Sequence, residues 1–301
     1  MTTTRFAVID LGSNTFHLLI VDLQADEQWT TVFKDRRYVK LASEGVEIIG
    51  EDSILRAIEV MKEFSQRLLQ LQVEETQAIG TAALREAANG IEVAKRLTEE
   101  SGIPVEIIDG DREAHYILKG IQSALPPLDK PCLIMDIGGG SVEFILYRHQ
   151  QVLFVQSFKI GVALLYRSFH QQDPMTQESI AALSSHLETA LEPVFNLLQQ
   201  YKEYFLVGAS GSFEVIQDVM PKIQKEWNWS ELDFRNLDAY MTEVIQSDLS
   251  SRRLREEIPV ERLDYIVVAY ILIRLILRHH PPKRFFYCDY ALKEGVIADK
   301  F

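Results

Sequence analysis

The sequence predicts an α/β protein of two domains, and three features of the chain carry this prediction. One β-hairpin pattern occurs twice, as FAVIDLGSNTFHLLIVD at residues 6–22 and as CLIMDIGGGSVEFILYR at residues 132–148, 126 positions apart. Apolar runs with strand and helix periods alternate after each copy. The length of 301 residues exceeds that of a typical single domain. We therefore expect domains at residues 1–125 and 126–301, with two prolines at the boundary and the last helix a candidate for packing back on the first domain.

Each hairpin consists of an apolar run that ends in Asp, a turn rich in small residues, and a second apolar run. The first turn, residues 10–15, reads DLGSNT, and the second, residues 136–143, reads DIGGGSVE. Backbone N–H groups in such loops can hold phosphate oxygens. Three consecutive glycines favour close approach of a ligand, whereas an ordinary hairpin turn explains the first copy equally well. The candidate phosphate-binding residues are Ser13, Asn14, Thr15, Gly138, Gly139, Gly140 and Ser141.

Carboxylates beside these turns predict a divalent cation. Asp136 and Glu143 stand at the facing ends of two antiparallel strands, which brings both carboxylates to one place. Mg²⁺ is bound by one or two carboxylates together with substrate phosphates, so this pair suits it. Asp10 takes the corresponding position in the first copy. Neither half contains GxxxxGK[ST], which excludes a Walker-type phosphate site.

The remaining elements follow from periodicity and from turn residues. In the first half we expect strands at 29–33, 76–79 and 105–108, and helices at 52–72 (N-cap Asp52 or Ser53), 89–102 and 111–124. In the second half we expect strands at 152–158, 204–207 and 284–288. Helices are expected there at 162–170, 176–201, 236–249, 261–280 and 290–299, with one more after the turn at 208–212.

Three further candidates lie outside the hairpins. Glu113 falls in the first turn of a helix, where the dipole keeps a carboxylate ionised and able to hold an attacking water as general base, although a surface Glu is the simpler alternative. Arg85 follows a strand, where it either clamps a phosphate or is merely solvated. The small-residue turn with Gly208, Gly211 and Ser212 precedes a helix and forms an anion site.

Composition excludes several classes of protein. The net charge of −13 argues against general nucleic-acid binding but permits a phosphorylated substrate in a local basic channel. Cys132 and Cys288 lie in apolar runs, which favours buried reduced thiols over a disulfide. The N-terminus lacks a signal-peptide pattern, and the most apolar later stretch, 266–277, is too short for a membrane span. We expect a cytoplasmic protein with no membrane partner.

The duplicated order β-β-β-α-β-α-β-α resembles the ribonuclease-H-like domains of the actin, sugar kinase and chaperone ATPase superfamily. The resemblance implies an α/β fold of two such domains that face each other across a phosphate-binding cleft.

Seven segments in the right order resemble the exopolyphosphatase/guanosine pentaphosphate phosphatase family, and together they cover essentially the whole chain. Besides the two hairpins they are GTAALREAANG (80–90), IDGDREAHYILKGI (108–121), VGASGSFEVI (207–216), ERLDYIVVAYILI (261–273) and CDYALKEGVI (288–297).

The resemblance implies Mg²⁺-dependent hydrolysis of a terminal phosphoanhydride. Glu113 would activate water, Asp136 and Glu143 would serve the metal or phosphate site, and Arg85 and Arg262 would be cleft arginines. The two loops would supply the phosphate contacts. Three departures from the family's usual pattern concern the shape of the substrate channel: Lys-Leu-Ala for Arg-Leu-Gly at residues 40–42, Pro259-Val260 for Pro-Gly, and a missing glycine at Ala269-Tyr270.

The sequence leaves the substrate open between inorganic polyphosphate, guanosine pentaphosphate, and short polyphosphates or nucleotides. Basic runs at 36–40, 252–255 and 278–284 are either a track for a long polyanion or ordinary solvated charge. A sugar or acetate kinase and a non-catalytic sensor of phosphate compounds are the rival classes. A homodimer is the default expectation for the assembly.

Overall fold

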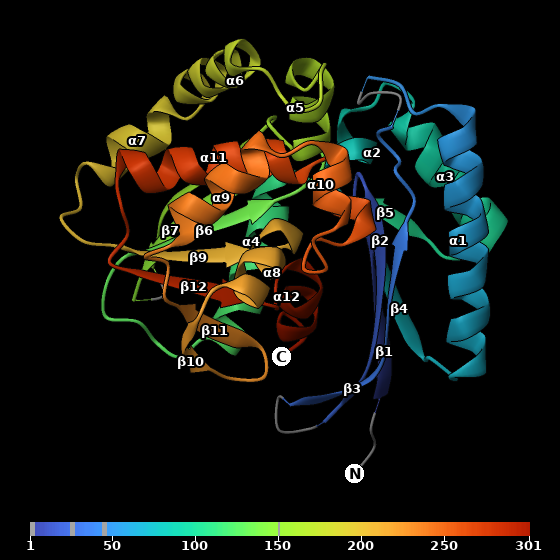
Figure 1. Cartoon of the computed structure of the whole chain (residues 1–301). Helices are drawn as coiled ribbons and strands as arrows, with labels where there is room; N and C mark the ends of the chain where they lie inside the picture. The colour runs from blue at the N-terminus through green and yellow to red at the C-terminus, as the bar shows by residue number, and fades with distance from the viewer. Residues whose placement is uncertain (1–3, 25–27, 44–46, 150) are drawn as a thin grey trace. The chain divides into compact units, whose positions relative to one another are not determined.

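The computed structural model describes residues 4–24, 28–43, 47–149 and 151–301. The chain divides into two compact units. Unit 1 comprises Met1–Ser123 and Leu292–Phe301, and unit 2 comprises Ala124–Ala291. Each unit is a mixed β-sheet with helices (Figure 1), so the predicted α/β class is confirmed.

Unit 1 contains a five-stranded sheet in the order β3-β2-β1-β4-β5. The first three strands are antiparallel neighbours, and β4 and β5 run parallel to β1, as the predicted β-β-β-α-β-α-β order requires. The strands are β1 (Thr4–Leu11), β2 (Thr15–Leu23), β3 (Trp29–Tyr38), β4 (Glu75–Gly80) and β5 (Val105–Ile107).

Helices α1 and α3 lie side by side on one face of this sheet (Figure 1). Ala7, Ile9 and Leu11 of β1 share a buried cluster with the apolar residues of these helices, because alternate residues of a strand point to the same face. The opposite face of β1 contacts α12. The helices of unit 1 are α1 (Glu51–Gln70), α2 (Ala82–Glu86), α3 (Gly90–Ser101), α4 (Gly110–Ala124, whose last residue falls in unit 2) and α12 (Leu292–Ala298).

The ends of the helices in unit 1 partly follow the sequence signals. Gly102 ends α3 in the left-handed conformation, with φ of 74°, as its glycine predicts. The predicted caps of α1 are wrong, because the helix begins at Glu51 and its N-cap is Gly50. The Ser53 hydroxyl is instead buried and donates to the Lys40 carbonyl at 3.3 Å.

Unit 2 contains a seven-stranded sheet in the order β10-β11-β12-β9-β6-β7-β8. The hairpin of β10 and β11 was not predicted, because β10 is a short, fully exposed strand with the polar sequence KIQK. The strands are β6 (Cys132–Ile137), β7 (Val142–Arg148), β8 (Gln151–Phe158), β9 (Phe205–Ala209), β10 (Lys222–Lys225), β11 (Trp229–Leu232) and β12 (Arg284–Cys288).

One large apolar core joins the sheet of unit 2 to its helices. The predicted helix 176–201 is two helices, because Pro193 cannot donate a helical hydrogen bond and starts a new one. The predicted helix 261–280 opens as a 3₁₀ turn, η1 (Val260–Arg262), before α11. The helices are α5 (Val162–Phe169), α6 (Gln177–Ala190), α7 (Glu192–Leu198), α8 (Gly211–Val219), α9 (Leu237–Gln246), α10 (Leu249–Arg253) and α11 (Ile266–His279).

Cys132 and Cys288 are free and buried, as predicted. No helix within the described ranges has both the length and the apolar character that crossing a membrane requires.

Candidate functional site

In each unit the predicted site residues lie at the carboxyl ends of the parallel strands. In unit 1 the parallel strands β1, β4 and β5 end where the first loop (residues 12–15), α2 and α4 begin. In unit 2 the parallel strands β6 and β9 end where the second loop (residues 138–141) and α8 begin. Ligands of open α/β sheets bind outside the carboxyl ends of their strands, so each unit presents its candidate residues at the expected edge.

The first loop is a tight turn at the end of β1. The Gly12 N–H donates to the Thr15 carbonyl at 3.1 Å, and Ser13 is buried. Asp10 stands directly opposite His17 in the β1–β2 register. The loop therefore combines a fixed backbone with one carboxylate and one imidazole on the same sheet face.

Residues 39–42, which the sequence did not predict to contact the first loop, hold that loop in place. The N–H groups of Val39 and Lys40 donate to the Asn14 carbonyl at 3.1 and 2.9 Å, and the Ala42 N–H donates to the Ser13 carbonyl at 3.0 Å. These bonds occupy the carbonyls of Ser13 and Asn14. The carbonyl side of the loop therefore faces residues 39–42. The only signal for this segment was its resemblance to a family motif.

The second loop is held in the same way. Its ends are joined by the Gly138 N–H, which donates to the Ser141 carbonyl at 2.9 Å. The carbonyls of residues 138–140 accept from the N–H groups of residues 161–163, at the start of α5. Gly161 permits this contact, because a Cβ there would lie 2.4 Å from the backbone of Gly139 and Gly140. The first N–H groups of α5 therefore hold the loop.

Asp136 and Glu143 face each other in the β6–β7 register, as predicted. Their neighbours Ile137 and Val142 belong to the buried core, so the two carboxylates lie on the opposite face of the sheet. Glu143 is only 2% exposed, and its Oε1 accepts from the Ser141 hydroxyl at 2.6 Å.

Two carboxylates on one sheet face fit a Mg²⁺ ion that completes its shell with water and phosphate oxygens. Within the described part of the chain, no group of three or more His, Cys, Asp or Glu forms a closed metal site. A Mg²⁺ ion held by this pair would need water or phosphate oxygens for its remaining ligands.

Glu113 and Arg85 form a pair that the sequence did not predict. The Arg85 guanidinium donates from Nη1 to Glu113 Oε2 at 2.8 Å and to the Ile108 carbonyl at 3.1 Å. Glu113 is 7% exposed, so the alternative of a surface glutamate is wrong. Arg85 lies on the short helix α2 and is not a solvated loop residue. The pair fixes the orientation of the Glu113 carboxylate at the carboxyl end of β5.

Two glycines of the small-residue turn before α8 leave room for neighbouring side chains. Gly208 leaves room for the Phe213 ring, which a Cβ would approach to 2.2 Å. Gly211 lies against the Arg262 guanidinium, and Arg262 Nη2 donates to Glu214 Oε2 at 2.7 Å. Ser212 follows in the first turn of α8. The turn therefore positions one of the predicted arginines.

Gly211→Ala tests the placement of Arg262. The new Cβ would lie 1.3 Å from Arg262 Nη1, so the guanidinium must move. Because the obstructing atom is the end of a flexible side chain, we expect an unchanged melting temperature but a rise in KM of about tenfold or more, the loss of one charge-assisted hydrogen bond. Kinetics with thermal melting measure this. Equal kinetic constants for wild type and variant would remove Arg262 from the site.

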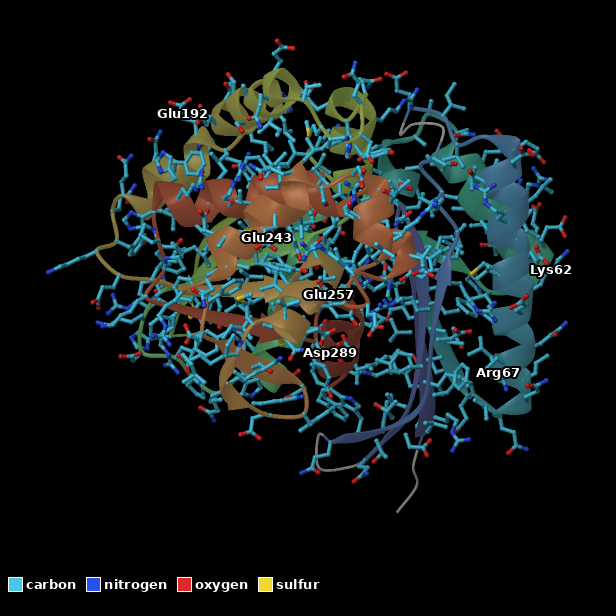
Figure 2. The ribbon with its side chains drawn as sticks, in the orientation of Figure 1. Lys62, Arg67, Glu192, Glu243, Glu257 and Asp289 are labelled. Atoms are coloured by element: carbon cyan, nitrogen blue, oxygen red, sulfur yellow. The ribbon has the colours of Figure 1, made fainter. Side chains whose placement is uncertain are left out.

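Several arginines of the predicted basic track are engaged in ion pairs. Arg255 contacts Glu243 and Glu257, both labelled in Figure 2. Arg278 pairs with Asp238 and Arg284 with Glu231. These cations already have carboxylate partners and do not form an open track.

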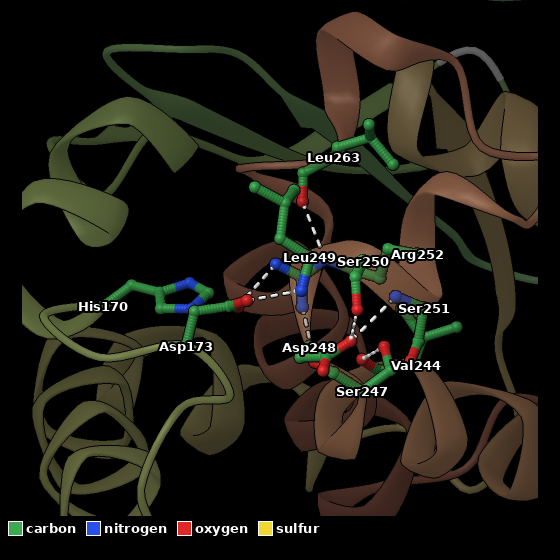
Figure 3. Close-up of polar contacts among 10 residues, drawn as sticks. All are labelled: His170, Asp173, Val244, Ser247, Asp248, Leu249, Ser250, Ser251, Arg252 and Leu263. Atoms are coloured by element: carbon green, nitrogen blue, oxygen red, sulfur yellow. Dashed lines mark hydrogen bonds and ion pairs between the residues drawn. The ribbon is translucent and has the colours of Figure 1, made fainter.

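Arg252 is buried and has a structural role. Figure 3 shows its guanidinium among three acceptors: the Leu263 carbonyl at 3.0 Å, the Ser247 carbonyl at 2.5 Å and Asp173 Oδ1 at 2.6 Å. His170 Nε2 lies 3.2 Å from the same oxygen, and because a carboxylate only accepts, Nε2 carries the proton. Arg252 thus connects three separate chain segments of unit 2.

Comparison with curated proteins finds relatives that are longer than this chain. A guanosine-5'-triphosphate,3'-diphosphate pyrophosphatase from Photobacterium profundum is 30% identical over 261 residues, covering 86% of this chain and 49% of that protein. The protein of the same name from Vibrio vulnificus is 30% identical, covering 71% of this chain and 43% of that protein. The chain spans about half the length of these curated relatives.

Solved structures match the chain over nearly its full length. An exopolyphosphatase from Cytophaga hutchinsonii has a TM-score of 0.91 and 33% identity, covering 99% of this chain and 98% of that one. The Aquifex aeolicus member of the Ppx/GppA family has a TM-score of 0.80 and 25% identity over 99% and 98%. The model of the Ppx/GppA phosphatase family matches residues 19–301. Because this match covers nearly the whole chain, the chain belongs to the Ppx/GppA phosphatase family.

Proposed function

We propose that this protein is an exopolyphosphatase-like hydrolase that releases terminal orthophosphate from inorganic polyphosphate. The observation that carries the proposal is the match to the Cytophaga hutchinsonii exopolyphosphatase, which covers 99% of this chain and 98% of that one. The buried Arg85–Glu113 pair supports it, because it supplies an oriented carboxylate beside the first loop's sheet edge.

In the proposed mechanism, loop N–H groups bind oxygens of the terminal phosphoryl group. Glu113 orients a water molecule and accepts its proton while the water attacks phosphorus in line. The P–O bond to the shortened chain breaks as the new P–O bond forms, and orthophosphate leaves. Asp136 and Glu143 of unit 2 would hold Mg²⁺, and Asp10 is a separate candidate ligand within unit 1. A bound Mg²⁺ would supply neutralisation of the developing charge. Positioning and charge neutralisation supply most of the acceleration.

The experiment that tests the proposal is orthophosphate release measured in parallel on long polyphosphate, tripolyphosphate, guanosine pentaphosphate and ATP, with and without Mg²⁺. We expect Mg²⁺-dependent release that is fastest on a polyphosphate. Release from none of the four substrates would refute the hydrolase proposal and favour a non-catalytic sensor. Phosphate transfer to an added sugar or acetate would favour a kinase.

Guanosine pentaphosphate is the second candidate substrate. Two curated relatives at 30% identity carry names that specify a guanosine-5'-triphosphate,3'-diphosphate pyrophosphatase. The same parallel assay separates the candidates, because this reading requires release from guanosine pentaphosphate to exceed release from tripolyphosphate.

Asp136→Asn tests the proposed Mg²⁺ site. Removing one carboxylate charge is expected to raise the Mg²⁺ concentration for half-maximal activity by about tenfold or more. Metal titration of activity measures this, with Asp218→Asn on α8 as a control at the same charge change. Superimposable titrations of wild type and the Asp136 variant would count against Asp136 as a ligand.

We also infer a cytoplasmic location and no nucleic-acid partner. Two buried free thiols suit a reducing compartment, and the net charge of −13 disfavours binding to a phosphate backbone.

A further inference from the structure

We propose that Lys40 is a substrate-binding residue of the first loop, where its ammonium group contacts the phosphoryl group next to the one held by the loop N–H groups. The inference rests on the proposed function, since it assigns a chain of at least two phosphates to this loop. Its starting point is the hydrogen bond of 2.9 Å from the Lys40 N–H to the Asn14 carbonyl. That bond places the base of a long, flexible cationic side chain directly beside the loop.

The backbone of Lys40 has an uncommon conformation that its surroundings maintain. Its φ of 51° lies in the left-handed region, which costs free energy for any residue other than glycine. The Lys40 carbonyl accepts from the Ser43 N–H at 3.1 Å, the Ser53 hydroxyl at 3.3 Å and Arg56 Nη2 at 3.4 Å. Arg56 Nε also donates to the Val39 carbonyl at 3.0 Å. The fold therefore holds a lysine where glycine would be the less strained choice.

The charge of Lys40 has no carboxylate partner in the described part of the chain, whereas nearby Arg37 pairs with both Asp35 and Glu63. The comparable position beside the second loop is Gly161, whose N–H reaches the Gly140 carbonyl as that of Lys40 reaches Asn14. A side chain cannot fit there, since a Cβ would meet the loop backbone at 2.4 Å. Of the two loops, only the first therefore has a lysine at this position. A polyanion is the ligand that would neutralise the charge of Lys40.

Binding of tripolyphosphate by calorimetry, with thermal melting, tests Lys40 through the variants Lys40→Met, Lys40→Gly and Lys40→Arg. We expect the Met and Gly variants to bind about tenfold more weakly, as loss of one charge-assisted contact implies, and the Arg variant to retain most of the affinity. Lys40→Gly should melt no lower than wild type, because it relieves the left-handed backbone. Gln72→Gly is the matched control: its φ of 53° gives the same relief at the end of α1.

A residue with only a structural role would lower the melting temperature in the variants and leave affinity unchanged. Wild-type affinity in both Lys40→Met and Lys40→Gly would overturn the inference. If wild-type protein binds tripolyphosphate but releases no orthophosphate, the hydrolase proposal fails. The affinities of the Lys40 variants for tripolyphosphate then still test whether Lys40 binds the polyanion. If it binds neither tripolyphosphate nor orthophosphate, both proposals fail.

Discussion

Glu113→Gln is expected to lower kcat on tripolyphosphate by about 10²- to 10⁴-fold, the usual contribution of a general base. An amide can still accept the Arg85 hydrogen bond through its oxygen, so the pair that fixes the side chain at 2.8 Å persists. It cannot take a proton from water at neutral pH. Binding should therefore remain within about twofold of wild type while turnover falls.

Steady-state kinetics and calorimetric binding measure the two effects separately. Glu106→Gln is the control, because Glu106 lies in the same unit, on β5, and is paired with Arg112 at the surface. It should leave both constants unchanged. A Glu113 variant that turns over at the wild-type rate would exclude Glu113 as the base and leave the Arg85–Glu113 pair with a structural role.

Arg252→Met is expected to lower the free energy of unfolding by about 3 kcal/mol, because a buried guanidinium with three acceptors is lost, one of them the 31% exposed carboxylate of Asp173. Arg252 is 1% exposed, and its loss leaves the Leu263 and Ser247 carbonyls and the Asp173 carboxylate without their donor. Urea denaturation measures the change. The exposed neighbour Arg253→Met should stay within about 0.5 kcal/mol of wild type. Equal losses in both variants would contradict the structural role of Arg252.

The same network predicts a loss of stability in acid. Burial opposes ionisation of Asp173, but hydrogen bonds from Arg252 and from the Leu249 N–H outweigh it and lower the pKa of Asp173 below its ordinary value. This stabilisation is complete above the unfolded pKa of about 3.9 and disappears as pH falls through the folded pKa. Burial lowers the pKa of His170, so its stabilising effect is present above about pH 6.5 and declines as pH falls. In Arg252→Met, the free energy of unfolding should depend less on pH in the range where Asp173 titrates.

The alternation of apolar and polar residues and the turn residues predicted the two loops and the Asp136/Glu143 pair of the candidate site. The repeated hairpins fixed both loops, and strand pairing placed Asp136 opposite Glu143 because the two residues bracket a turn at matching distances. Gly102 marked the end of α3 because the left-handed cap favours glycine. Such features depend on neighbours within a few residues, and local sequence contains that information.

Only the tertiary structure decided the contacts between distant segments. Arg85 meets Glu113 across 28 positions, and Arg262 meets Glu214 across 48. Lys40 reaches the first loop because β3 returns beside β2, and Arg252 joins three segments that no period relates. Hydrophobic periods report which face of an element is buried, but they do not specify which partner it meets. The sequence by itself therefore determined the two loops and the fold class, and packing decided which charged side chains accompany them.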